Sequence, residues 1–497
     1  MPTPRASGLL VHPTSLPGPH GIGDVGSGAY QFVDFLKAAA QQLWQVLPLG
    51  PVGHGNSPYA ARSAFAGNPL LISLPRLADE GLLTAADLGS IPVVPVGPVD
   101  YEAVEARKLP LLRRAFGNLP SAPAGLRAEF GRFCESHGSW LRDYALFAAL
   151  HEAFDGAPWV EWEPDLAHRQ PASLARAEAR LAEEVRFHSF LQFAFFRQWT
   201  ALKRYAHARG IRVIGDLPIF VAHDSADVWS RPELFRLGPD GRSLVVAGVP
   251  PDHFSKTGQL WGNPIYDWEA MAQNGYAWWI ERVRGALEQV DVLRLDHFRG
   301  FQAYWEVPAT EETAANGRWV KGPGTRLFAA LREALGELPF IAEDLGLITP
   351  EVEALREQLG LPGMKVLQFA FDDDPDNPYL PHNYERNSVV YTGTHDNDTA
   401  RGWYTNADPD TQHFVRLYLG RDGHDIAWDL IRLALSSVAD WAVIPLQDVL
   451  DLGSEARMNT PGRLGGNWTW RCESHQLADL TAVRLAELTR IYGRAPG

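Results

Sequence analysis

Short apolar runs recur along the chain, and most of them are followed by a loop and a helical pattern. Eight of these runs have the length and residue types of β-strands and end in a polar or small residue. Strands that alternate with helices are typical of a parallel sheet, so eight of them predict an α/β fold of the (β/α)8 TIM-barrel type. The runs are residues 8–12, 43–48, 211–216, 291–296, 340–344, 366–370, 389–393 and 443–448.

Helix signals lie between many of the runs. The stretch "YQFVDFLKAAAQQ" has apolar residues at helical spacing on one face, namely Phe32, Phe35, Leu36 and Ala39. Thr349 and Pro350 are suited to the cap and the first position of a helix after the fifth run. These signals support the alternation of strands and helices that a barrel requires.

Two connections are longer than a strand–helix crossover needs. Residues 49–210, after the second strand, predict an inserted helical subdomain, and residues 217–290, after the third, predict another insertion that includes a loop at 248–264. We therefore expect one catalytic (β/α)8 barrel over residues 1–497 with inserted, mainly helical subdomains.

One predicted strand, within "QVDVLRLDHFRG", carries charges where a buried strand should stay apolar. Successive strand residues point to opposite faces, so Arg294 and Asp296 share one side with Val292. Leu293 and Leu295 face the other way. The simplest explanation is that this strand ends in a cleft that needs a carboxylate beside a cation.

Four acids closely follow apolar runs, at Asp216, Asp296, Glu343 and Asp396. The carboxyl ends of barrel strands meet at one mouth, where catalytic residues lie. Any one acid could instead cap a helix or pair with an arginine, but four together favour a site. Clustered carboxylates suit glycosidic bond chemistry, in which one acts as nucleophile and another as acid. Asp296 beside Arg294 fits the ionised nucleophile, and Glu343, in an apolar strand, fits the acid.

Three other motifs resemble dinucleotide-, calcium- or metal-binding patterns, and we reject each of these assignments. "GIGDVG" (21–26) matches a dinucleotide pattern, but the prolines before it break the required strand–turn–helix context. "DDDPDNP" (372–378) begins like a calcium loop and lacks its glycine and final glutamate. "GTHDNDT" (393–399) could hold a metal through His395, Asp396 and Asp398, but no second His/Glu cluster supports it. We expect no metal and no cofactor.

Composition narrows the class of partner. The net charge of −15 argues against nucleic acid and anionic membrane surfaces. Two cysteines cannot build a disulfide framework, and no apolar run resembles a signal peptide or a membrane span, so we expect a cytoplasmic protein. Some of the 17 Trp and 14 Tyr could serve as platforms for sugar rings.

The motifs together resemble amylomaltase, the 4-α-glucanotransferase or disproportionating enzyme of glycoside hydrolase family 77 in the α-amylase clan. The resemblance extends from about residue 8 to 472, nearly the whole chain. It rests on "LPGPHGIGDVG", "SPY" (57–59), "GDLPIFV", "GVPPDHFSKTGQLWGNP" (248–264), "RLDHFRG", "AEDLG", "GTHDNDT", "NTPG" and "GNWTWR".

The resemblance implies an inserted (β/α)8 barrel without a C-terminal β-sandwich, and a retaining double displacement. Segments of α-1,4-glucan would pass to the 4-hydroxyl of glucose or another glucan, with no metal or organic cofactor. By residue-to-residue match, Asp296 is the nucleophile, Glu343 the general acid/base and Asp396 the transition-state stabiliser. The residues implied in substrate binding are Ser57, Tyr59, Asp216, Phe254, Gln259, Trp261, Arg294, His297, His395 and Asn467.

The resemblance also predicts the partners. We expect malto-oligosaccharides, amylose or glycogen-derived glucans as substrates, and a monomer or weak homodimer. An α-1,4-glucan hydrolase would use the same carboxylates and differ only in its acceptor. A catalytically silent, glucan-binding barrel is the alternative from another class, although such a protein has no need of the full acid set.

Overall fold

The barrel is closed by parallel pairing of its first and last strands. The computed structural model describes residues 5–251, 255–463 and 465–496. Within these residues, eight parallel strands form a closed barrel in the order β1-β12-β11-β10-β9-β6-β3-β2, with Ala6 opposite Trp441 at the closure. Each strand overlaps one of the eight predicted runs, so the (β/α)8 fold is confirmed. The strands are β1 (Ala6–Leu10), β2 (Leu43–Gln45), β3 (Arg212–Leu217), β6 (Val292–Leu295), β9 (Phe340–Ala342), β10 (Gly363–Val366), β11 (Ser388–Tyr391) and β12 (Trp441–Pro445).

The sixth barrel strand differs most from its predicted position. The apolar run 366–370 overlaps β10 only at Val366, and the 3-10 turn Leu367–Phe369 replaces the rest of the expected strand. Leu367 is fully buried in that turn, and Gln368 Nε2 donates to the carbonyl of Asp398 at 2.8 Å. An apolar run in the sequence therefore indicates burial, and a turn can be buried as well as a strand.

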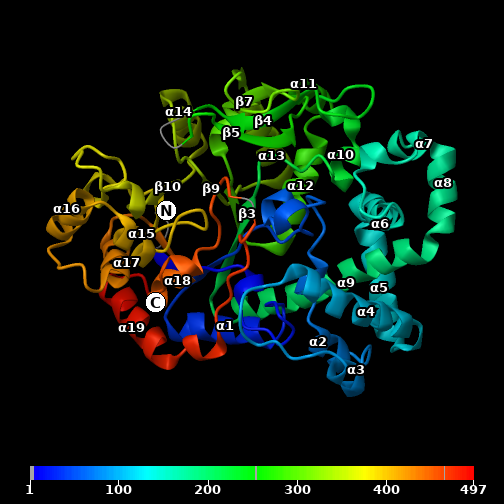
Figure 1. Ribbon diagram of the computed structural model, residues 1–497, viewed down its shortest axis with the longest axis horizontal. Helices are drawn as coiled ribbons and strands as arrows, with labels where there is room; N and C mark the ends of the chain where they lie inside the picture. The colour runs from blue at the N-terminus through cyan, green and yellow to red at the C-terminus, as the bar shows by residue number, and fades with distance from the viewer. Residues whose placement is uncertain (1–4, 252–254, 464, 497) are drawn as a thin grey trace.

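Helices surround the barrel and follow most of its strands (Figure 1). The first and last α-helices of the described chain, α1 and α19, pack against each other beside the barrel. In the described part of the chain, the connection from β10 to β11 contains 3-10 turns in place of an α-helix. The surrounding helices are α1 (Ser27–Ala38), α9 (Ala182–His207), α12 (Ala277–Gln289), α13 (Thr325–Leu335), α14 (Pro350–Leu359), α15 (Ala400–Asn406), α16 (Pro409–Leu419), α17 (Ile426–Ser436), α18 (Leu446–Val449) and α19 (Asp479–Ile491).

The long connection from β2 to β3 is built from helices beside the barrel, drawn in blue and cyan in Figure 1. Helices α4, α5 and α6 pack against the long helix α9, which returns the chain to the barrel. The helices that precede α9 are α2 (Leu74–Asp79), α3 (Ala85–Gly89), α4 (Tyr101–Asn118), α5 (Ala124–Ser136), α6 (Gly138–Ala153), α7 (Pro164–Ala167) and α8 (Pro171–Arg180).

A second, antiparallel sheet lies at the top of Figure 1, and sequence analysis did not anticipate it. Its order is β5-β4-β7-β8, so the connection after β3 and the connection after β6 each contribute two strands. Much of the predicted loop 248–264 is therefore a hairpin. The strands are β4 (Val245–Val249), β5 (Gln259–Pro264), β7 (Ala303–Pro308) and β8 (Arg318–Lys321), with the short helices α10 (Ala226–Ser230) and α11 (Trp268–Gln273) nearby in sequence.

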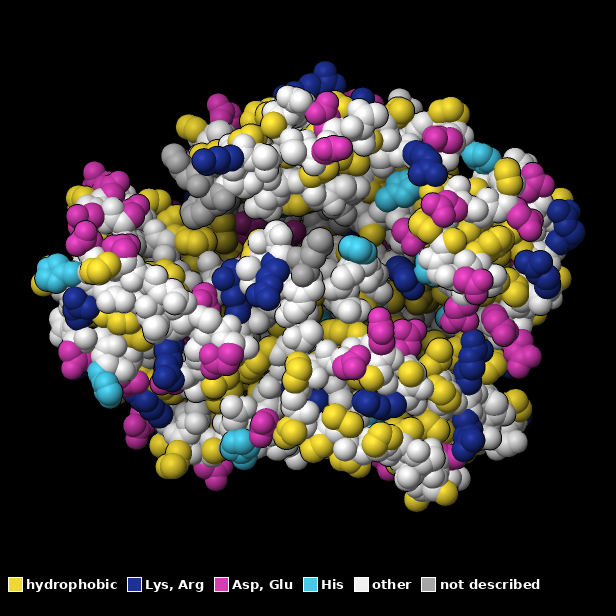
Figure 2. Space-filling model, viewed as in Figure 1, with side chains coloured by type: hydrophobic (Ala, Val, Ile, Leu, Met, Phe, Trp, Pro, Cys, Tyr) yellow, Lys and Arg dark blue, Asp and Glu magenta, His cyan; other side chains and the backbone are white. Residues whose placement is uncertain are grey.

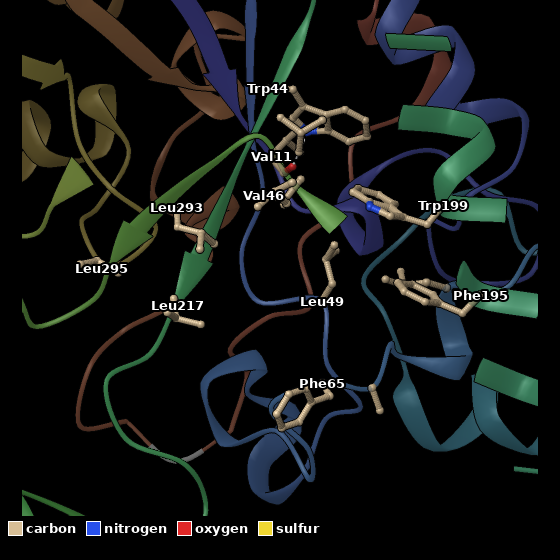
Figure 3. Packing of buried hydrophobic residues seen from close by; sticks show 14 of the residues in the cluster. Val11, Trp44, Val46, Leu49, Phe65, Phe195, Trp199, Leu217, Leu293 and Leu295 are labelled. Atoms are coloured by element: carbon tan, nitrogen blue, oxygen red, sulfur yellow. Dashed lines mark hydrogen bonds between the residues drawn. The ribbon is translucent and has the colours of Figure 1, made fainter. Parts of the chain in front are cut away.

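Alternation along the barrel strands separates two cores. Trp44 points outward and packs against Trp199 of α9, with ring centroids 6.0 Å apart (Figure 3). Leu43 points inward, where it joins an interior cluster with Val292 and Met364. The interior is apolar at the start of the strands and becomes polar towards their carboxyl ends, and this change positions the site.

Candidate active site

A buried arginine connects two aspartates at the mouth of the barrel. Asp216 on β3 lies directly opposite Arg294 on β6 in the parallel register. Arg294 Nη1 donates to both carboxylate oxygens of Asp216 at 2.8 Å and to Oδ1 of Asp296 at 3.1 Å. The side chains of Arg294 and Asp216 are buried, and buried charges require such pairing. The network therefore fixes the carboxylate of Asp296 from the strand beneath it.

Tyr59 extends this network from the turn after β2. Its hydroxyl donates to Oδ2 of Asp216 at 2.7 Å, and its ring stacks on His395 with centroids 5.1 Å apart. Ser57 caps the 3-10 turn that carries Tyr59, because Ser57 Oγ accepts from the Tyr59 backbone N–H at 3.2 Å. The turn thus holds an aromatic ring between the ionic network and the segment after β11.

Glu343 lies beside Asp296 because the two residues leave neighbouring strands at the same level. Leu295 of β6 is opposite Ala342 of β9 in the register, and Asp296 and Glu343 are the residues that follow. The backbone N–H of His297 donates to Oε2 of Glu343 at 2.6 Å. His297 has φ of 51°, a left-handed conformation that is uncommon outside glycine. This turn directs its N–H towards Glu343.

The two adjacent carboxyls both resist ionisation, but to different extents. Burial raises the pKa of Glu343 to about 8, with Arg294 opposing the shift and the charge of Asp296 adding to it. Burial raises the pKa of Asp296 to about 6, again with Arg294 opposing and with Asp216 adding to the shift. Near neutral pH, Asp296 is mainly ionised while Glu343 is mainly protonated. Arg294 acts on both, whereas the sequence associated it with Asp296 alone.

Asp396 lies beyond the end of β11, in a turn, and has different neighbours. His395 Nε2 lies 3.3 Å from its Oδ2, and Asn459 Nδ2 donates to its Oδ1 at 2.6 Å. Burial opposes ionisation, but His395 and Asn459, with a smaller contribution from Arg294, outweigh it. Together they hold the pKa of Asp396 below its usual range, so this carboxylate stays charged.

Two residues that the sequence did not single out, Asn459 and Trp468, lie in the segment 453–472, which we call the strap and of which the structure describes all but residue 464. Asn459 contacts Asp396 directly, and the Trp468 ring lies 5.9 Å from Tyr59 and 6.0 Å from His395. In the sequence, Asn459 lies in the motif "NTPG" and Trp468 in "GNWTWR", and neither motif by itself indicates a role for these two residues. Asn467, which the resemblance implies in substrate binding, accepts from the Thr460 N–H at 3.0 Å within the strap.

The antiparallel sheet contributes an aromatic side chain on another side of the site. Trp261 on β5 is 37% exposed, and its ring meets His297 edge to face at 4.8 Å. Gln259 Oε1 accepts from Trp261 Nε1 at 3.3 Å. Phe254, the other aromatic of the predicted loop, lies outside the described residues. Figure 2 shows a hollow beneath the part of the molecule that carries β4, β5 and β7, with acidic side chains deep inside it.

Two features do not occur among residues 5–251, 255–463 and 465–496. No group of three or more His, Cys, Asp and Glu side chains is arranged to hold a metal ion. No helix in these ranges combines the length and the apolar character needed to cross a bilayer.

Comparisons with known proteins agree on one family. Residues 11–477 match the family model described as 4-alpha-glucanotransferase. The chain is 54% identical to the 4-alpha-glucanotransferase of Synechocystis sp. over 99% of this chain and 98% of that protein. It is also 54% identical to the 4-alpha-glucanotransferase of Thermus thermophilus, over 99% of this chain and all of that protein. Among solved structures, the amylomaltase from Streptococcus agalactiae in complex with acarbose aligns with a TM-score of 0.96 and 40% identity, covering 99% of this chain and 100% of its own.

Proposed function

This chain belongs to the 4-alpha-glucanotransferase family, and we propose that Asp296, Glu343 and Asp396 carry out its reaction by a double displacement. The enzyme is a glycosyltransferase that acts on α-1,4-glucans. The observation that supports these roles best is the hydrogen bond from the His297 N–H to Glu343, because it places an acid beside Asp296 at the mouth of the barrel.

In the first half of the reaction, an oxygen of Asp296 attacks the anomeric carbon of the donor glucan. Glu343 gives its proton to the departing glycosidic oxygen, so the donor's reducing-end segment leaves with a free hydroxyl and the remaining segment is held as an ester. The raised pKa of Glu343, about 8, supports this role, because a general acid must keep its proton near neutral pH.

In the second half, Glu343 acts as a base towards the 4-hydroxyl of an acceptor glucan. The acceptor oxygen attacks the same carbon, the bond to Asp296 breaks and an α-1,4 linkage is restored. Two inversions give net retention. Asp396 binds hydroxyls of the distorted sugar ring, most strongly in the transition state, and its low pKa keeps it ionised for that purpose.

The remaining residues bind the sugars on either side of this centre. Arg294 and His395 neighbour the donor ring, while Tyr59 and Trp261 offer ring faces to the acceptor. Transfer must compete with attack by water, so an acceptor site has to position the incoming 4-hydroxyl. The half-exposed ring of Trp261 beside His297 fits that task.

Hydrolysis is the alternative that shares all three carboxylates, and the names of the relatives favour transfer. We propose malto-oligosaccharides and longer α-1,4-glucans as donors and acceptors. Incubation with maltotriose, followed by thin-layer chromatography, tests the reaction. A ladder of longer oligosaccharides together with glucose is the expected product pattern, whereas shorter sugars alone would mean that water is the acceptor.

A further inference from the structure

Each of the two carboxylate oxygens of Asp396 has a side-chain partner. Its Oδ1 accepts from Asn459 Nδ2 at 2.6 Å, and its Oδ2 lies 3.3 Å from His395 Nε2. One partner precedes Asp396 in the chain and the other comes from the strap after β12. A carboxylate engaged at both oxygens cannot rotate about its terminal bond without losing one contact.

The backbone of Asn459 is itself fixed by two further hydrogen bonds, and a third joins Arg457 to Asp396. Its backbone N–H donates to the carbonyl of His395 at 3.1 Å. Arg457 donates from Nε to the Asn459 carbonyl at 2.7 Å and from Nη2 to the Asp396 carbonyl at 2.6 Å. Backbone and side chain of Asn459 are thus both tied to the turn that carries Asp396, so the amide is directed at one oxygen.

The strap is anchored to the body of the protein on both sides of Asn459. Met458 packs into the interior cluster of the barrel, and its carbonyl accepts from the Trp468 N–H at 2.8 Å. The Tyr101 hydroxyl, at the start of α4, donates to the Trp468 carbonyl at 2.9 Å. Cys472 N–H donates to the Ser15 carbonyl at 2.8 Å. Asn459 therefore acts from a fixed platform.

We propose that Asn459 is a positioning residue, which sets the orientation of the Asp396 carboxylate towards the hydroxyls of the reacting sugar through its Nδ2–H. This inference rests on the proposed role of Asp396. Displacement of a catalytic group by about 1 Å can cost ~10²-fold in rate, so a single directed hydrogen bond is sufficient to matter. Because Asn459 acts through Asp396, replacing Asn459 should change mainly kcat.

The first test replaces the amide and compares it with a neighbour in the same strap. Asn459→Ala should lower kcat for maltotriose disproportionation by roughly 10- to 100-fold while KM changes little. Met458→Leu is the matched control, because it alters an adjacent strap residue that points into the barrel and conserves volume. Its kcat should stay close to that of the wild type.

The second test uses the isosteric variant Asn459→Asp. It distinguishes a side chain that acts by donating a hydrogen bond to Asp396 from one that only fills the space beside it. A protonated carboxyl at 459 can donate to Oδ1 of Asp396 as the amide does, whereas an ionised one repels it. The ratio of variant to wild-type kcat should therefore rise as the pH falls, by up to about tenfold per unit. The other titratable or charged groups facing Asp396 are His395, Tyr59, Arg294, Asp296 and Arg457, and all are shared by both proteins.

Three results would overturn the proposal: wild-type kcat in Asn459→Ala, an equal loss in Met458→Leu, or a pH-independent ratio for Asn459→Asp. Thermal melting of each variant identifies a loss that comes from unfolding, and the pH-dependent ratio is unaffected by a constant folding defect. Asp396→Asn separates this proposal from the one it rests on. If Asp396→Asn keeps its activity, the role of Asp396 is wrong; if only the Asn459 variants do, the positioning role is wrong.

Discussion

Two aspartates of the candidate site, Asp296 and Asp396, have different surroundings. Asp296 sits on a strand end in a network of charges, with Arg294 shared between it and the buried Asp216. Asp396 sits in a turn, accepts a hydrogen bond from Asn459 and lies 3.3 Å from Nε2 of His395. The pKa of Asp296 is raised to about 6, and that of Asp396 lies below its usual range.

This difference follows the chemistry proposed for each group. A nucleophile that forms and breaks a bond benefits from neighbours of both signs, because its own charge disappears and returns during the cycle. A group that stabilises positive charge must keep its own negative charge throughout, and donors placed on the carboxylate ensure it. Identical side chains are thus separated in function by what surrounds them.

The largest effect should come from removing the carboxylate of Asp296 from its network with Arg294 and Asp216. Asp296→Ala should lower the disproportionation rate by roughly 10⁴-fold or more, because no other group can form the ester. Azide should restore donor cleavage in this variant and yield a β-glucosyl azide, since it can enter the space left by the carboxylate. Asp396→Ala should lose activity without such rescue. A variant of Asp296 that keeps a tenth of the wild-type rate would contradict the nucleophile assignment.

Glu343→Gln should give the next largest loss, about 10³-fold with maltotriose, because general acid catalysis contributes ~10²–10⁴-fold. A maltosyl fluoride donor, whose leaving group needs no proton, should restore formation of the ester. The wild-type profile of kcat/KM should fall below pH about 6 as Asp296 gains a proton, and above pH about 8 as Glu343 loses one. The alkaline limb should vanish in Glu343→Gln, and its persistence there would assign it to another group.

Asp216→Asn tests whether a remote charge tunes the nucleophile. Asp216 helps to raise the pKa of Asp296, so removing its charge should lower that pKa and move the acidic limb of kcat/KM to lower pH. We expect a loss of about tenfold at the pH optimum, because Arg294 and Tyr59 also lose their shared partner. An unshifted acidic limb would show that the two sites are not coupled.

Tyr59→Phe should have the smallest effect of the series. It removes only the hydroxyl that donates to Asp216 and keeps the ring stacked on His395, so a loss of about fivefold is expected. Tyr59→Ala also removes the ring, and should lower the ratio of transfer to hydrolysis measured with maltotriose. An unchanged ratio would exclude Tyr59 from the acceptor site.

The sequence predicted the network around Arg294 better than it predicted the neighbours of Asp396. Arg294 and Asp296 stand out because charges interrupt a buried strand, and alternation alone places them on one face. Asp216 follows from the same reasoning, since strand ends in a barrel share a mouth. No such periodicity exists for Asn459 or Trp468, which lie in an irregular strap. Their contacts with Asp396 and Tyr59 depend on where the chain turns after β12.

The second sheet eluded prediction for a related reason. Its hairpins β4–β5 and β7–β8 come from different connections, and the join between them is the pairing of β4 with β7. Val246 meets Val307 there, far apart in sequence, and neither run is long enough to predict a partner. The sixth barrel strand was misplaced because Leu367 is as buried in a turn as it would be in a strand.

The pairing of β1 with β12, which closes the barrel, has a consequence for folding during synthesis. Ala6 is synthesised well before its partner Trp441, which follows it by 435 residues (441 − 6) in the sequence. The first strand must therefore wait with one edge open, where it is exposed to wrong pairing and aggregation. Contacts of such long sequence separation slow folding, so this closing pairing is the step at which we expect nascent molecules to be most vulnerable.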